Sequence, residues 1–204
     1  MSFCSSRQVC GALLTTVYST PPNCRFEVDD VEDEWTFSYK FDFIHGRALI
    51  SCFRDPASVI GQAFDALAPG GYLELQDVVY PTQYVGEPSK DSAIVKWNEL
   101  ILTATAKSGR PWTNVQHYSR WMREAGFVDV EERKFYWPTN PWPKNRHLKK
   151  LALWFQQDIL DVLEGVSMKL FTNFLGWSPE EVQVLCAGMR KDIKDPSIHA
   201  YVTV

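Results

Sequence analysis

Apolar and polar residues in the first part of the chain follow the alternating pattern of short strands. Residues 24–28 and 41–45 alternate well enough to predict two strands, and a polar turn at Gly46-Arg47 follows the second. Residues 1–22 show no convincing period, so they are predicted to be an irregular leader.

A helical pattern comes next and leads into a third strand. The apolar side chains of residues 58–67 fall on one helical face, and the Pro-Gly-Gly sequence at 69–71 breaks that helix. Residues 72–79 then predict a strand that is entered through a tight turn. The order strand, strand, helix, strand is typical of an α/β sheet with crossover helices.

Amphipathic helices dominate the second half of the chain. Apolar stripes predict helices over residues 91–107, 117–125 and 148–165, and Gly126 stands where a helix C-cap favours glycine. Residues 178–181 (Ser-Pro-Glu-Glu) form a capping box with proline at the first helical position, which predicts the start of a fourth helix.

Two further strands and one stiff loop complete the pattern. Residues 127–136 predict a strand, and the charged run at 131–134 indicates that it lies at a sheet edge. Residues 199–204 predict a closing strand, and residues 137–143 form a loop rich in proline and tryptophan.

The length and the pattern together predict one domain over residues 1–204. The leader at 1–22 is followed by a Rossmann-like α/β core at 23–136. A helical region with the closing strand occupies residues 137–204, and we expect its helices to cover one face of the sheet.

Composition and charge narrow the classes of partner. The net charge of -4 gives no electrostatic reason to expect direct nucleic-acid binding, and no apolar run is long enough to span a membrane. The five cysteines include no CxxC pair and no histidine pair at metal spacing, which argues against a disulfide framework or a metal site. An intracellular location, cytoplasmic or nuclear, fits these cysteines best.

Several motifs in order carry a resemblance to a known family over residues 21–204. They are PPNCRFEVDDVEDEWTF, FDFIHGRALISCFRDP, ALAPGGYLELQD, REAGF and the tail WSPEEVQVLCAGMRKDIKDPSIHAY. In these motifs the chain resembles the LaeA-like fungal methyltransferases. The resemblance implies a class I, Rossmann-like methyltransferase fold. It also implies that S-adenosylmethionine is the cofactor and that the methyl acceptor is often a small natural product of secondary metabolism.

The resemblance also implies site residues on two segments that follow strands. Asp29 and Asp30 would accept from the adenine amino group while Val31 packs on the ring, because ligands of such folds lie at the carboxyl ends of the strands. The alternative is a solvated acidic loop. His45 would serve as a general base near the acceptor, since its ordinary pKa lies near neutrality. The alternative is a hydrogen-bonded polar residue at a strand end.

Four further residues are candidates for binding the acceptor. Arg47 lies beside His45 in the sequence, and Trp112, Trp137 and Trp142 would form the wall of an acceptor pocket. The alternative for the three tryptophans is packing in the core, because large aromatic side chains bury much apolar area.

The resemblance is incomplete at the N-terminal side. No glycine-rich cofactor turn (GxGxG) and no ribose-binding acid can be placed, because Gly11 is the only glycine before Pro21. In the family's sheet order two strands lie between the strand at 24–28 and the strand at 41–45. We expect the leader to supply one replacement strand at most, through residues 9–18, so the sheet is predicted to be incomplete.

Two classes of function therefore stay open. The chain is either a methyltransferase represented by a shortened sequence, or a diverged, non-catalytic accessory protein of a biosynthetic pathway. In the second case the loop at 137–143 and the helices after it would dock on a protein partner. The expected partner is accordingly a small-molecule acceptor or a protein, and whether the chain is an enzyme stays undecided at this point.

Overall fold

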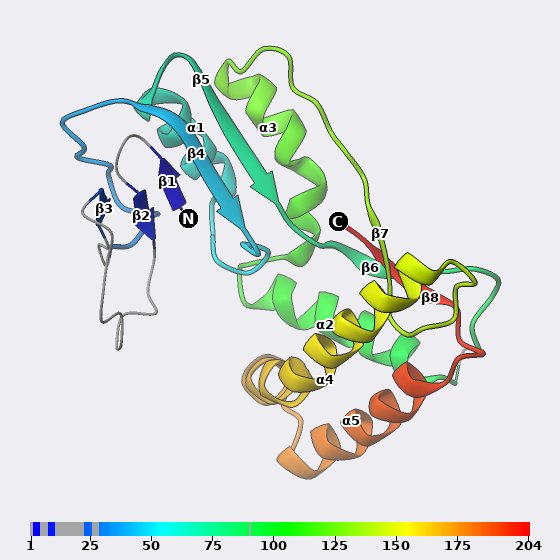
Figure 1. Cartoon of the computed structure of the whole chain (residues 1–204). Coiled ribbons are helices and arrows are strands. Elements are labelled where there is room, and N and C mark those ends of the chain that lie inside the picture. The colour runs from blue at the N-terminus through cyan, green and yellow to red at the C-terminus, as the bar shows by residue number, and fades with distance from the viewer. Residues whose placement is uncertain (1, 5–7, 11–22, 26–28, 90) are drawn as a thin grey trace. The chain divides into compact units, whose positions relative to one another are not determined.

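The computed structural model describes residues 2–4, 8–10, 23–25, 29–89 and 91–204, which form two compact units (Figure 1). Unit 1 comprises residues 1–77 and 116–132, and unit 2 comprises residues 78–115 and 133–204. Both combine helices with strands, so the α/β prediction is confirmed. The single domain over 1–204 stays a prediction.

Unit 1 is built on a five-stranded sheet with the order β3-β2-β1-β4-β5. Its strands are β1 (Ser2–Cys4), β2 (Gln8–Cys10), β3 (Cys24–Arg25), β4 (Phe41–Arg47) and β5 (Leu67–Gln76). The β2/β3 and β4/β5 pairs are parallel, whereas β1 runs antiparallel to both β2 and β4.

The prediction that residues 1–22 form an irregular leader is wrong at residues 2–4 and 8–10, which are strands. Two leader segments form strands, not one, and they lie between β3 and β4. Their backbone groups pair there with the neighbouring strands, which removes the cost of two unpaired sheet edges. Residues 11–22, which hold most of the expected replacement strand, lie outside the described residues. The strand at 24–28 is described only at Cys24–Arg25.

Strands β4 and β5 differ from the prediction at their ends. Gly46 and Arg47 continue β4 and do not form a turn. The Pro-Gly-Gly sequence lies inside β5, where Phe41 pairs with Leu67 and the next pair is Phe43 with Tyr72. Residues 68–71 therefore form a bulge.

The bulge requires both glycines. Gly70 has a φ of +82°, which favours glycine, and a Cβ on Gly71 would lie 3.0 Å from the Ala68 carbonyl oxygen. The sequence element that was expected to precede the strand is thus a bend within it.

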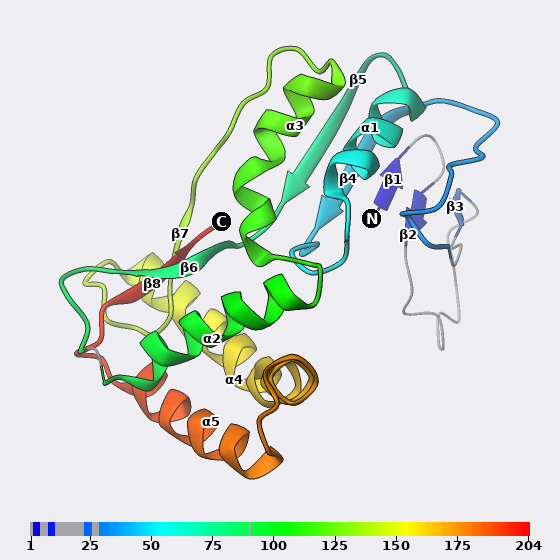
Figure 2. The ribbon, with the colours of Figure 1, turned by 180° about the vertical axis from the view of Figure 1, so that it is seen from behind.

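Two helices pack on the β4–β5 pair, and Figure 2 shows them in front of these strands. They are α1 (Pro56–Ala66) and α3 (Tyr118–Ala125), and both predicted helices are confirmed. The core beneath α1 contains the buried side chains of Phe41, Ile44, Ala63 and Leu67. The predicted C-cap at Gly126 is also confirmed, with a φ of +111°.

Unit 2 combines an antiparallel sheet with three packed helices. The sheet has the order β6-β8-β7, with β6 (Val79–Tyr84), β7 (Tyr136–Pro138) and β8 (Ala200–Thr203). The helices are α2 (Ala93–Lys107), α4 (Arg146–Leu175) and α5 (Pro179–Lys194), and a 3-10 helix, η1 (Trp112–His117), follows α2. Each of the three α-helices contacts the other two.

Several predictions in this region need correction. The strand expected at 127–136 is absent up to residue 135, and only Tyr136 enters β7. Helix α4 passes through Gly165, where it was expected to end, because the buried side chains of Ser167 and Phe171 continue its packed face. The closing strand is confirmed as β8.

The capping box at the start of α5 is confirmed and allows a stability prediction. The Ser178 hydroxyl accepts from the Glu181 amide at 3.2 Å, and the Glu181 carboxylate accepts from the Ser178 amide at 2.8 Å. We expect Ser178→Ala to lower the free energy of unfolding by about 1 kcal/mol, because the first turn of α5 loses an acceptor. Urea unfolding measures this change, with the exposed Ser51→Ala as the control. Equal midpoints for the two variants would contradict the prediction.

Candidate functional site

Residues 29–34, which we call the acidic loop, expose two carboxylates with free acceptor atoms. Asp29 Oδ1 accepts from the Asp30 amide at 3.0 Å, and Asp30 Oδ1 accepts from the Glu32 amide at 3.0 Å. Among the described residues, no donor contacts Oδ2 of either aspartate. Both carboxylates can therefore accept a hydrogen bond from a ligand N–H group.

The rest of the acidic loop is anchored to unit 1. Val31 is half-buried and packs on a core cluster, while its carbonyl accepts from Trp35 Nε1 at 2.9 Å. Glu32 Oε1 accepts from the backbone amides of Arg54 and Asp55 at 2.7 and 3.0 Å. These amides lie directly before α1, so the Glu32 carboxylate ties the loop to the start of that helix. The loop is exposed at Asp29 and Asp30 but fixed behind them.

His45 and Arg47 lie within β4, so their predicted position just past the strand is wrong. The strand ends at Arg47, and the next residue, Ala48, has a φ of +55° and an amide that donates to the Gln76 carbonyl at 3.0 Å. His45 is half-buried, and its Nδ1 lies 3.0 Å from Glu74 Oε2 on the adjacent strand. This pairing orients the imidazole. The role of His45 as a general base stays a prediction.

The three candidate tryptophans all belong to unit 2, and each has its own packing partner. Trp112 is buried and its ring centroid lies 4.7 Å from that of Tyr80. Trp137 packs edge-on against Phe155, with a centroid distance of 5.4 Å. Trp142 stacks on the ring of His199, with a centroid distance of 4.7 Å.

These contacts give each tryptophan a packing role. Among the described residues, the Trp112 Nε1 atom is the one buried side-chain polar atom without a hydrogen-bond partner. Trp142 Nε1 donates to the Ala200 carbonyl at 3.0 Å. The acceptor-pocket role of the tryptophans, and that of Arg47 in unit 1, stays a prediction.

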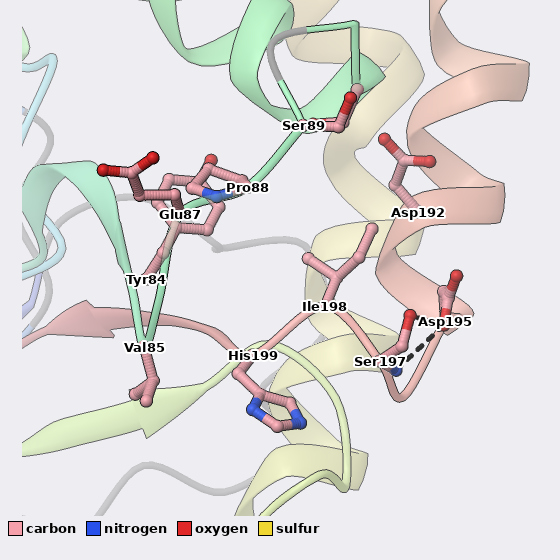
Figure 3. A pocket seen from close by; sticks show the side chains of 11 residues that line it. Tyr84, Val85, Glu87, Pro88, Ser89, Asp192, Asp195, Ser197, Ile198 and His199 are labelled. Atoms are coloured by element: carbon pink, nitrogen blue, oxygen red, sulfur yellow. Dashed lines mark hydrogen bonds between the residues drawn. The ribbon is translucent and has the colours of Figure 1, made fainter.

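Unit 2 contains a pocket of about 380 Å³ between the segment that follows β6 and the segment that follows α5 (Figure 3). Two of the three carboxylates that line it, those of Asp192 and Asp195, have structural partners. Asp192 accepts from the Ile94 amide at the start of α2, at 3.1 Å, and Asp195 accepts from the Ser197 amide and hydroxyl at 2.8 and 2.7 Å. The residues that line it are Tyr84, Val85, Glu87, Pro88, Ser89, Ser92, Asp192, Asp195, Ser197, Ile198 and His199.

The pocket includes one phenol that stays neutral in the physiological range. Burial raises the pKa of Tyr84 to about 12, against the opposing effect of a hydrogen bond from Asn98. No motif in the sequence indicates this pocket, because its two lining segments, 84–92 and 192–199, lie far apart in the chain.

Unit 1 contains a buried carboxylate that the motifs did not single out as a site residue. Asp77 follows β5 directly and is 8% exposed. Its Oδ2 accepts from the Leu49 amide at 2.9 Å and from the Tyr118 hydroxyl at 3.3 Å. Burial, and then the charge of Asp77, raises the pKa of Tyr118 far above its ordinary value, so the hydroxyl stays protonated and donates. The final aspartate of ALAPGGYLELQD was the available sequence signal.

Within the part of the chain that the structure describes, no three His, Cys, Asp or Glu side chains group together as a possible metal site. No described helix is both long enough and apolar enough to cross a membrane.

Residues 3–132 match the protein family described as "Methyltransferase domain". The probable methyltransferase tdiE of Emericella nidulans is 34% identical over 176 residues, which are 86% of this chain and 55% of that protein. The secondary metabolism regulator laeA of Monascus pilosus is 27% identical over 186 residues, which are 90% of this chain and 51% of that protein. The chain thus spans about half the length of these relatives.

A solved structure is also similar to the chain. It is the phosphoethanolamine N-methyltransferase 2 of Haemonchus contortus, in complex with phosphomonomethylethanolamine and S-adenosylhomocysteine. The identity is 18% and the TM-score is 0.43, over 89% of this chain and 36% of that chain.

Proposed function

The chain belongs to the methyltransferase-domain family, and on this basis we propose that it acts in S-adenosylmethionine-dependent methyl transfer in fungal secondary metabolism. The resemblance to LaeA-like fungal methyltransferases is confirmed by the similarity to tdiE and laeA. The names of those two proteins, a probable methyltransferase and a regulator of secondary metabolism, support the proposal. Because the chain spans about half their length, the activity of the whole relatives is extended to it only as a proposal.

The acidic loop is the observation that carries this proposal. It lies within the matched residues 3–132, and it combines an anchored Val31 with carboxylate oxygens on Asp29 and Asp30 that accept from no donor in the described part of the chain. These groups fit the adenine end of S-adenosylmethionine, since the carboxylates can accept from the amino group and Val31 can pack on the ring. When bound, S-adenosylmethionine supplies an activated methyl group.

The acceptor side of the proposal rests on His45 and its neighbours. His45 pairs with Glu74, and this arrangement can take up a proton from an acceptor that loses one on methylation. Arg47 is the proposed acceptor-binding residue of unit 1, and an acceptor-binding role of the three tryptophans of unit 2 is a separate proposal. The acceptor itself is proposed to be a small natural product.

Asp30→Ala is expected to weaken the binding of adenosine by about tenfold or more, because a charged acceptor of the adenine amino group is removed. NMR titration measures this, through ligand-induced shifts of the amide signals of residues 29–33. Asp65→Ala, an exposed aspartate on α1, is the matched control. Unchanged affinity in Asp30→Ala, or shifts confined to other parts of the chain, would refute the adenine site.

A non-catalytic role as an interaction protein of such a pathway is the second proposal. The observation in its favour is the similarity to a relative named as a regulator. Its partner would be a protein that docks on the loop at 137–143 and on the helices after it. A methyl-transfer assay with labelled S-adenosylmethionine and a co-purification experiment separate the two functions, because only the first requires label to reach an acceptor.

We also propose an intracellular location, cytoplasmic or nuclear. Cys52 is an exposed cysteine and Cys186 a buried one, neither forms a disulfide among the described residues, and exposed thiols persist in reducing compartments. Fluorescence microscopy of a tagged chain tests this location, and secretion of the tagged protein would refute it.

A further inference from the structure

The segment that follows β4 is held by the segment that ends β5. The amide of Ala48 donates to the Gln76 carbonyl at 3.0 Å, and the amide of Leu49 donates to Asp77 Oδ2 at 2.9 Å. Ala48 has a φ of +55°, which is an unfavourable conformation for a residue with a Cβ atom. Two hydrogen bonds donated by consecutive amides therefore fix a strained bend, and a buried carboxylate accepts one of them.

The same bend supports the acidic loop. Leu49 and Phe53 are buried in one cluster, and Val31 of the acidic loop packs against that cluster. Glu32 of the loop in turn binds the amides of Arg54 and Asp55. The position of residues 49–55 thus determines the position of residues 31 and 32.

From these contacts we propose that Asp77 is a positioning residue of the acidic loop, acting through Leu49, with Tyr118 as its supporting donor. Asp77 fixes the bend at Ala48–Leu49, the bend fixes the Leu49–Phe53 cluster, and the cluster fixes Val31. The Tyr118 hydroxyl contacts the same carboxylate oxygen and so restrains its orientation. For ligand binding, this inference rests on the proposed adenine site.

The proposal requires an acceptor atom at position 77 and not a negative charge. Asp77→Asn keeps an oxygen that can accept from Leu49 and Tyr118, whereas Asp77→Ala keeps none. In Asp77→Ala we expect the Leu49 amide proton to exchange about tenfold faster, because its buried acceptor is lost. The methyl signals of Val31 should move in the same variant, and the affinity for adenosine should fall about fivefold or more.

NMR of the whole chain provides all three measurements, with Asp65→Ala on the α1 surface as the control. Restoration of the Leu49, Val31 and adenosine values in Asp77→Asn supports the proposal, because a role of the charge alone would not be rescued. Tyr118→Phe gives a second test if Asp77→Ala does not fold, and a smaller shift of the same Val31 signals is expected.

Unchanged Val31 signals in both Asp77→Ala and Tyr118→Phe would overturn the proposal, even if the variants unfold more easily. Unchanged adenosine affinity in Asp77→Ala alongside shifted Val31 signals would overturn its functional part. If the wild-type chain shows no adenosine-induced shifts, the proposed adenine site fails. The Val31 signals then still decide for or against the positioning role.

Discussion

S-Adenosylhomocysteine is expected to bind the 204-residue polypeptide no more tightly than about millimolar. The acidic loop provides acceptors for the adenine end, but the sequence contains no GxGxG turn and no acid that can be placed at the ribose. Strands β1 and β2 fill the sheet between β3 and β4, yet their sequences, SFC and QVC, hold neither glycine nor acid. Each missing hydrogen bond to a charged group removes about 1.5–3 kcal/mol, and every 1.4 kcal/mol weakens binding tenfold.

Isothermal titration measures this affinity, and adenosine provides the internal comparison. If only the adenine end is bound, adenosine and S-adenosylhomocysteine should have similar affinities, since the methionine part adds no contact. A chimera that carries the glycine-rich segment of a family member should bind S-adenosylhomocysteine more tightly while its affinity for adenosine changes less. Micromolar binding of S-adenosylhomocysteine by the unmodified polypeptide would contradict the prediction.

The helices were largely predictable because their signals are local. The start of α5 follows from four consecutive residues, 178–181, and the end of α3 follows from Gly126. Gly165 misled the prediction for α4, because a mid-helix glycine costs only about 1 kcal/mol and the buried side chains of Ser167 and Phe171 maintain the helix beyond it.

The strands were less predictable because their partners decide them. Residues 127–135 are strand-like apart from the charged run at 131–134, yet they form no strand in the structure. In contrast, β6 was not predicted, since Pro81 interrupts its pattern. Its register with β8 shifts between Val79 and Gln83, so the missing N–H group of Pro81 falls in the irregular part of the ladder. Such compensation between distant segments has no local signal.

The candidate site shows the same division. The exposed carboxylates of the acidic loop could be identified from a motif, because they follow one another in the sequence. The contact of His45 with Glu74 and the contacts of Asp77 with Leu49 and Tyr118 depend on sheet register and on helix packing. The two members of these pairs are separated by 29, 28 and 41 positions in the sequence, and only the fold brings them together.

Asn140→Ala is expected to destabilise unit 2 by about 3 kcal/mol, because it removes three side-chain hydrogen bonds. No sequence motif indicated these bonds. Asn140 is fully buried, and its Nδ2 donates to the carbonyl oxygens of Asp195 and Ile198, both at 3.0 Å. Its Oδ1 accepts from the Trp142 amide at 3.2 Å. The side chain therefore fastens the turn after α5 to the loop after β7. Alanine would remove all three hydrogen bonds, while the Asp195 carbonyl would still accept from the Ile198 amide and the Trp142 amide would still donate to the Asn140 carbonyl.

Native-state hydrogen exchange of the β8 amide protons measures this loss, because the fastened turn leads directly into β8. A loss of about 3 kcal/mol corresponds to exchange that is faster by about a hundredfold. Asn173→Ala, at an exposed position on α4, is the control for removal of an amide side chain. Asn140→Asp keeps the shape but removes both donors, so it should be at least as destabilising as alanine. Full stability in Asn140→Asp would show that packing, and not hydrogen bonding, is what Asn140 contributes.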